Sequence, residues 1–150
     1  MTPEQLTAFL HNSIALTRAI GVRVTRADGG CVRLVAPLEP NLNHHGTAFG
    51  GSLATVGILA GWIALHNALA EAGIEAALVV RKTDLDYLQP VTGELVAESE
   101  LPQESWLRFK DSLQRGQRAR IEVHSRLLAA AGVDGVVIRA TYVALPHPST

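Results

Sequence analysis

The residues best suited to chemistry lie in one loop, residues 43–51, which reads Asn-His-His-Gly-Thr-Ala-Phe-Gly-Gly. It leads into an apolar segment expected to be a helix. The first amides of a helix have no partner within it, and the helix dipole adds positive potential at that end. At Gly50, Gly51 and Ser52 such amides could bind an oxygen that gains negative charge. Alternatively, the two glycines only permit a tight turn into the helix.

Two adjacent histidines in this loop are further candidates. A histidine titrates near neutrality, so His45 could act as a base, and His44 is the second choice. The alternative for both is an exposed ring, or one bonded to backbone. Adjacent histidines diverge and the sequence offers no matching further ligands, so no metal site is expected here.

The segment that follows the loop must be the central element of the fold. Residues 51–72 are apolar nearly all round, which predicts a helix covered by other protein on several sides. A stripe of minimal side chains on this helix would let a sheet approach its backbone. The stripe comprises Ala54, Gly57, Gly61, Ala64 and Ala68.

The remaining pattern indicates two further helices and six strands. Thr2, Pro3 and Gln5 begin an amphipathic helix that is expected to run to Gly21, and a short helix follows Pro102. Alternating apolar positions predict strands, most clearly in residues 118–127. The expected strands are residues 20–27, 31–38, 76–88, 94–101, 118–127 and 136–145. This order favours an α+β fold in which one antiparallel sheet curls round the central helix.

Length, charge and cysteine content limit the function. The 150 residues suffice for one core, so we expect a single domain over residues 1–150. Thirteen basic and fourteen acidic residues nearly cancel, which points to a small-molecule partner and away from nucleic acid or a membrane surface. Residues 53–65 are too few for a bilayer span. A lone cysteine, Cys31, and an N-terminus without a secretory signal favour the cytoplasm.

The string NHHGTAFGGSLATVGILAGW, residues 43–62, resembles the start of the central helix in hotdog thioesterases. The similarity is greatest to the putative-thioesterase family of the YiiD C-terminal type, and the order of elements agrees over nearly the whole chain. This resemblance implies a hotdog fold, a homodimer or dimer of dimers paired through residues 76–88, and hydrolysis of acyl thioesters. The substrate would be an acyl-coenzyme A or an acyl carrier protein. Coenzyme A or phosphopantetheine would enter as part of that substrate, with no separate cofactor.

The resemblance also suggests roles for individual residues. Gly50, Gly51 and Ser52 would form the oxyanion hole, and Asn43 or His45 would orient or activate water. No carboxylate occupies the first two turns of the helix, where related enzymes of the phenylacetate type carry an acid, and Phe49 stands where many of them have histidine. The candidates to replace that acid are Asp84 and Asp86, reaching a partner's loop, or Thr55 orienting water. For either aspartate, an ordinary salt bridge is the alternative. The residues expected to contact substrate are Thr47, Phe49, Thr55 and Tyr87.

Two other functions fit the sequence less closely. A hydratase or dehydratase would need a histidine and a carboxylate facing the substrate, and the absence of an acid from the first two turns of the helix opposes that reading. A non-catalytic acyl-binding or dimerisation module would need neither. A basic group around the short helix could meet coenzyme A phosphates or an acidic carrier protein, or form an ordinary solvated face. It comprises Arg108, Lys110, Arg115, Arg118 and Arg120.

Overall fold

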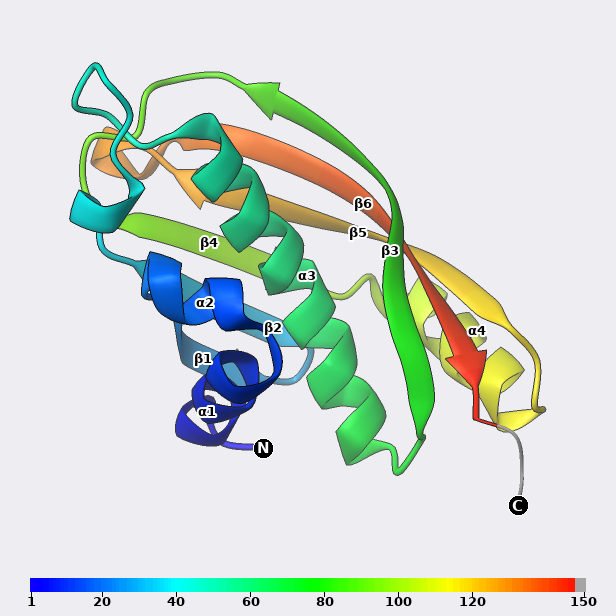
Figure 1. Cartoon of the computed structure of the whole chain (residues 1–150). Coiled ribbons are helices and arrows are strands. Elements are labelled where there is room, and N and C mark those ends of the chain that lie inside the picture. Colours follow the sequence, from blue (N-terminus) through cyan, green and yellow to red (C-terminus); the bar gives the residue numbers. More distant parts are fainter. Residues whose placement is uncertain (148–150) are drawn as a thin grey trace.

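A long helix, α3 (Gly50–Glu71), lies in the concave side of a six-stranded antiparallel sheet (Figure 1). The computed structural model describes residues 1–147. The strands are β1 (Arg23–Asp28), β2 (Cys31–Ala36), β3 (Ala76–Tyr87), β4 (Leu95–Glu100), β5 (Ala119–Leu128) and β6 (Asp134–Pro146). Their order across the sheet is β1-β2-β4-β5-β6-β3, so β1 and β3 are the edges. The predicted α+β hotdog architecture is confirmed.

The N-terminal helix begins as the sequence predicts but ends earlier. In α1 (Pro3–Ser13) the Thr2 hydroxyl accepts from the Gln5 amide at 3.1 Å, and the Gln5 side chain accepts from the Thr2 amide at 2.8 Å. Ile14 then adopts extended backbone, and a second helix, α2 (Ala15–Ile20), continues to Gly21. The expectation of one unbroken helix to Gly21 is therefore wrong. The break lets α1 bury Leu10 and α2 bury Ile20.

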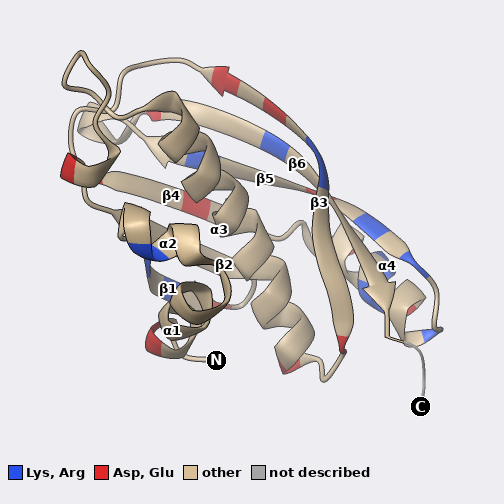
Figure 2. Ribbon diagram, in the orientation of Figure 1, with Lys and Arg blue, Asp and Glu red and all other residues tan. Residues whose placement is uncertain are grey.

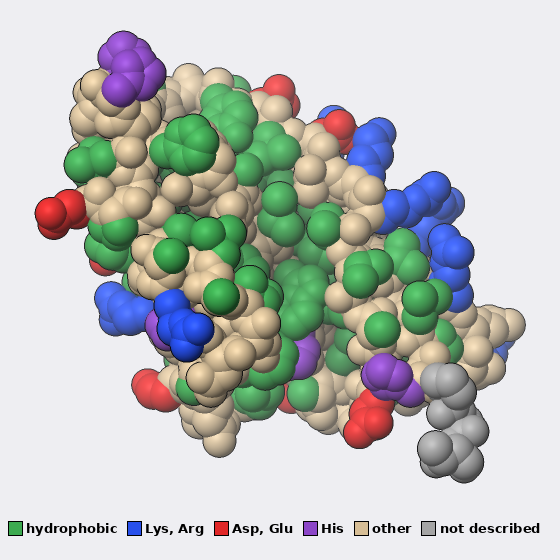
Figure 3. Space-filling model, in the orientation of Figure 1, with side chains coloured by type: hydrophobic (Ala, Val, Ile, Leu, Met, Phe, Trp, Pro, Cys, Tyr) green, Lys and Arg blue, Asp and Glu red, His purple; other side chains and the backbone are tan. Residues whose placement is uncertain are grey.

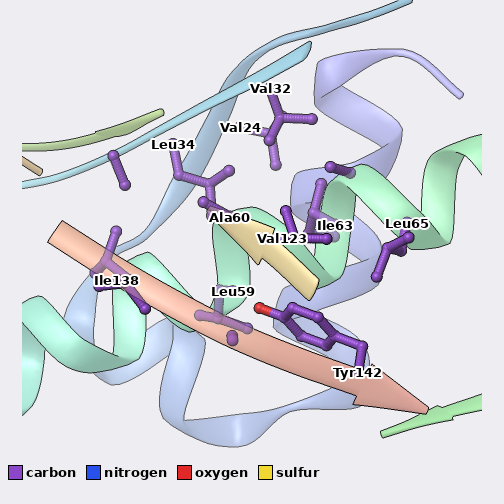
Figure 4. Close-up of a cluster of buried hydrophobic side chains, with 14 of the residues drawn as sticks. Val24, Val32, Leu34, Leu59, Ala60, Ile63, Leu65, Val123, Ile138 and Tyr142 are labelled. Carbon is purple, nitrogen blue, oxygen red and sulfur yellow. The ribbon is translucent and has the colours of Figure 1, made fainter. Parts of the chain in front are cut away.

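The stripe of small side chains on α3 lets the sheet approach the helix backbone closely, as the sequence predicts. A methyl group on Gly57 would lie 1.9 Å from Ile138 Cδ1, and one on Gly61 would lie 2.5 Å from the Tyr142 hydroxyl oxygen. That hydroxyl donates to the Ile58 carbonyl at 2.6 Å. Figure 4 shows Ile138 and Tyr142 of β6 beside Leu59 and Ala60 of α3. The absence of side chains at two positions thus fixes the sheet against the helix.

The helix α3 is the protein's core helix. By length and composition it could span a membrane, but 67% of its most apolar stretch of 18 residues is buried within the fold. Its C-terminal half is flanked by α1 and by α4 (Gln103–Gln114), which buries Phe109 and Leu113. Gly116, with a φ of 74°, follows the end of α4. The last strand, expected from residue 136, already begins at Asp134.

The edge strand β3 contains a register shift between Val80 and Lys82. Before it, Val80 pairs with Tyr142 on the inner face of the sheet, which faces α3. After it, Lys82 pairs with Thr141 on the outer face. The extra residue therefore exchanges the two faces of the strand, so that Leu85 turns toward α3.

Candidate active site at the start of α3

The loop before α3 is held in shape by the side chain of Asn43. Its carbonyl oxygen accepts from the backbone amides of His45 at 2.8 Å and Thr47 at 3.1 Å. Its amide group donates to the Thr47 hydroxyl at 2.8 Å. The backbone amide of Asn43 also donates to the Thr47 carbonyl at 2.8 Å. The polar atoms of Asn43 are thus engaged within the loop, and Thr47 is its main partner.

Two backbone bonds connect this loop to the rest of the fold and set the start of the helix. Ala48 donates to the Val91 carbonyl at 2.8 Å, and Phe49 donates to the Asn41 carbonyl at 2.7 Å. The first helical hydrogen bond runs from the Leu53 amide to the Phe49 carbonyl. Within the described part of the chain, the amides of Gly50, Gly51 and Ser52 have no acceptor, and no side chain caps the helix. These are the bare amides that an oxyanion hole requires.

The electrostatics at this helix end favour a negative ligand. No acidic side chain lies in the first turn of α3, so nothing there neutralises the positive end of the helix dipole. Gly51 is exposed, and Gly50 and Ser52 are partly exposed. A carbonyl oxygen could therefore reach the first turn from solvent.

Three predicted contact residues surround the amides. The Tyr87 hydroxyl donates to the Gly50 carbonyl at 2.9 Å, which brings the end of β3 against the first turn of α3. The Phe49 ring lies so near Gly51 that an added methyl group would come within 2.4 Å of Cε1. The Thr55 hydroxyl donates to the Gly51 carbonyl at 2.8 Å. The site thus has an aromatic wall on two sides.

The ionisable candidates lie apart from these amides in the single subunit. His44 and His45 are exposed in the loop, with their ring centroids 3.8 Å apart, and neither is among the atoms nearest to the α3 glycines. Asp84 and Asp86 alternate with Leu85, which faces α3, so both point to the outer face. Asp84 lies 3.8 Å from Lys82 Nζ. The structure therefore brings together the backbone donors and leaves the acids on the other side of the sheet.

A partly exposed stripe runs along α3 away from the amides. It passes from Gly51 through Thr55 and Ile58 to Trp62 and His66, positions that share one side of a helix. Figure 3 shows apolar atoms along a groove between this helix and β3. The groove offers an apolar surface that begins at the bare amides.

At its far end the groove widens into a hollow of about 550 Å³ between α1, α3 and β3. Phe9, Trp62 and His66 line it, with the His66 ring stacked 4.4 Å from Phe9 and 4.9 Å from Trp62. Burial, and after it the positive N-terminal amino group, lowers the pKa of His66. A stack of three rings from α1 and α3 has no local sequence signal.

The structure does not gather metal ligands. Within residues 1–147, no three His, Cys, Asp or Glu side chains lie in a position to hold a metal ion together. Burial raises the pKa of the Cys31 thiol, which keeps it in the less reactive protonated form.

The predicted basic group divides into three parts. Arg115, directly after α4, pairs with Asp111 of that helix, and Lys110 lines a separate hollow beside Trp106. Arg108, Arg118 and Arg120 come together around another hollow, where Arg81 and Lys82 of β3 join them. Sequence reasoning missed Arg81 and Lys82, because only the strand order brings β3 near β5 across β6.

Comparison with known proteins agrees with this architecture. A protein of unknown function from Chlorobaculum tepidum TLS has 28% sequence identity and a TM-score of 0.91, over 97% of this chain and 94% of that one. A Pseudomonas aeruginosa protein of unknown function, described as a probable thioesterase, has 25% identity and a TM-score of 0.81, over 97% of both chains. A putative thioesterase from Shewanella oneidensis, at 24% identity, shares the fold with a TM-score of 0.86 over 96% of this chain and 97% of that one.

The family comparison covers nearly the whole chain. The model of the family described as "putative thioesterase (yiiD_Cterm)" matches residues 3–146. That range includes the loop, all of α3 and every strand. The chain belongs to this putative thioesterase family.

Proposed function

We propose that the protein hydrolyses acyl thioesters, and that the amides of Gly50 and Gly51 bind the thioester oxygen as it becomes negative. The observation that carries this proposal is the exposed first turn of α3, with amides that have no acceptor in residues 1–147 and no acid beside them. Family membership supports the reaction class. One donor aimed at a developing oxyanion contributes about 3 kcal/mol to transition-state stabilisation.

In this mechanism water attacks the thioester carbonyl, the oxyanion is held by the amides, and the thiol leaves. Asn43 keeps the loop in the shape that presents the amides, through its bonds to His45 and Thr47. His45 is our first choice for activating water. Asp84 and Asp86 would have to act from a second copy, because in their own subunit they face away from α3.

The acyl group would lie in the groove along α3, against Ile58 and toward Trp62. Both side chains are partly exposed on the side of the helix that begins at Gly51. We propose acyl-coenzyme A or acyl carrier protein as the substrate, with the coenzyme or phosphopantetheine as the leaving thiol. With its unpaired Cys31, the protein would act in the cytoplasm.

We further propose that two copies associate through β3. This strand is twelve residues long, and within residues 1–147 it is hydrogen-bonded on one side only, by β6. Val79 and Val80 on it are 52% and 43% exposed, and long apolar edge strands tend to pair. Light scattering should give a dimer, and a protein that is monomeric at assay concentrations would refute this part.

A hydrolysis screen over short to long acyl-coenzyme A substrates, followed by release of free thiol, tests the function. We expect turnover by the native protein, and a folded Asn43→Ala protein that is slower. Ile58→Trp, which fills the groove, should lower kcat/KM for long acyl chains more than for acetyl. No turnover of any acyl-coenzyme A or acyl carrier protein would contradict the proposal.

A second candidate is a module that binds acyl thioesters without turnover. The observation that favours it is the absence of a carboxylate facing the amides within residues 1–147 of one subunit. Tight binding of acyl-coenzyme A with no thiol release would select this function. The same observation counts against a hydratase or dehydratase.

A further inference from the structure

A second hollow, of about 810 Å³, lies between α4 and the outer face of the sheet. Its floor is made by outward residues of β5 and β6, among them Arg120 and Thr141. Its walls come from β3 and from α4. We name it the basic groove, and its basic members are Arg81, Lys82, Arg108, Arg118 and Arg120.

The charge in the basic groove is strongly one-sided. Five cationic side chains line it and Glu122 is the one carboxylate among its lining residues, although the whole chain has a net charge of −1. The Glu122 carboxylate accepts from His124, and this bond lowers the pKa of Glu122. Figure 2 shows basic residues on β3, on β5 and around α4, and Figure 3 shows basic side chains projecting along the same edge.

The arginines of the basic groove also lack the partners that arginines have elsewhere on this face. In the part of the chain that the structure describes, Arg81, Arg108, Arg118 and Arg120 form no ion pair. Lys82 contacts Asp84, which is not part of the lining.

A neighbouring hollow on the outer face provides the comparison. It is about 450 Å³ and includes three arginines, each of which pairs with a carboxylate. Arg33 and Arg126 both contact Glu98, at 2.9 and 3.7 Å, and Arg26 contacts Asp28 at 2.9 Å. An ordinary charged face of this sheet is thus internally neutralised, and the basic groove is not. Unpaired like charges at close range repel one another, and a bound anion would remove that repulsion.

The donors indicate what kind of anion fits. Guanidinium groups bind phosphate through two parallel hydrogen bonds. The hydroxyls of Ser105, Ser112 and Thr141 also line the groove and can donate to phosphate oxygens. Phe109 adds apolar wall. The volume lies in the range of sites for whole organic ligands, well above what one phosphate needs.

We propose that the basic groove binds an organic polyphosphate of nucleotide size, at a site separate from the α3 amides. Two sources share this chemistry, a free nucleoside polyphosphate and the nucleotide end of coenzyme A. Pairing of β3 edges would leave the outer face open, since edge pairing uses the backbone. The inference does not depend on thioester hydrolysis.

Calorimetric titration of the full chain with ATP and with adenosine 3′,5′-bisphosphate, in the absence of any thioester, tests the proposal. We expect saturable binding that weakens as salt is added, and no binding of adenosine. Arg108→Gln and Arg120→Gln should each weaken binding about tenfold or more, since each removes a charged donor to phosphate. Tighter binding of ATP would indicate a free nucleotide, and tighter binding of the bisphosphate would indicate coenzyme A.

The matched control is Arg18→Gln, which removes the same charge from an exposed position on α2. It should bind as the native chain does. All three side chains are exposed, so the variants should fold, and thermal unfolding verifies this. Lack of saturable binding of both nucleotides overturns the proposal, as does an equal loss in Arg18→Gln. Binding of an acidic carrier protein without binding of either nucleotide also overturns it.

Discussion

Replacing Gly50 by proline removes one amide hydrogen from the start of α3 while keeping the helix. Gly50 is the first helical residue, the position that tolerates proline best because its amide has no helical partner. Phe49 before it has φ −63° and ψ 132°, which is the backbone that a residue preceding proline adopts. The substitution is therefore compatible with the fold, and it should change the free energy of unfolding by less than about 1 kcal/mol.

The effect on catalysis should be much larger. If the Gly50 amide holds the oxyanion, its loss should lower kcat about 100-fold to 1,000-fold, which corresponds to about 3–4 kcal/mol. The control is Gly50→Ala, which retains the amide. Its methyl group would lie 3.4 Å from Tyr87 Cε1, an ordinary contact, so its activity should stay near that of the native protein.

The assay combines thiol release from an acyl-coenzyme A with urea unfolding of all three proteins. A proline variant that is as stable and as active as the alanine variant would refute our assignment of the Gly50 amide. A proline variant that loses stability along with activity would show that the backbone reasoning itself is wrong.

Two further predictions concern α3. Gly61→Ala should destabilise the protein by about 1–3 kcal/mol, because its methyl group meets the Tyr142 hydroxyl at 2.5 Å. Adding Tyr142→Phe to this variant should recover part of the loss. Purely additive changes in the free energy of unfolding would contradict this coupling. The lowered pKa of His66 means that the unfolded chain binds more protons, so stability should fall as the pH drops through and below 6.5 and level off below the folded pKa. The free energy of unfolding, measured by urea titration at pH values on both sides of 6.5, should change less with pH in His66→Gln than in the native protein. An equal change with pH in both proteins would assign the effect to other groups.

Local features of the fold could be predicted from the sequence, because neighbouring residues determine them. The Thr2–Gln5 cap depends on residues three apart, and the glycines of α3 indicate close contact wherever the partner comes from. The break at Ile14 could not be predicted, since the apolar pattern continues across it and only packing in three dimensions requires it. The same limit applies to the basic groove, whose members are distant in sequence.

The candidate site could be predicted only where neighbouring residues determine it. The position of the bare amides follows from where α3 begins, which the glycines mark. The bonds of Asn43 within its own loop, and the contact of Tyr87 with Gly50, depend on how loop and strand fold back. The roles predicted for Asn43, His45, Asp84 and Asp86 stay predictions, and the Asn43→Ala assay addresses the first of them.

The irregularity in β3 decides which charges the cleft contains. If the alternation ran unbroken through Arg81, with no register shift, Asp84 and Asp86 would turn inward and Tyr87 outward. The extra residue therefore keeps two carboxylates off the helix side of the strand and brings the phenol to Gly50. One extra residue in the strand, with no change in side-chain chemistry, thus separates a cleft with bare donors from an acidic one.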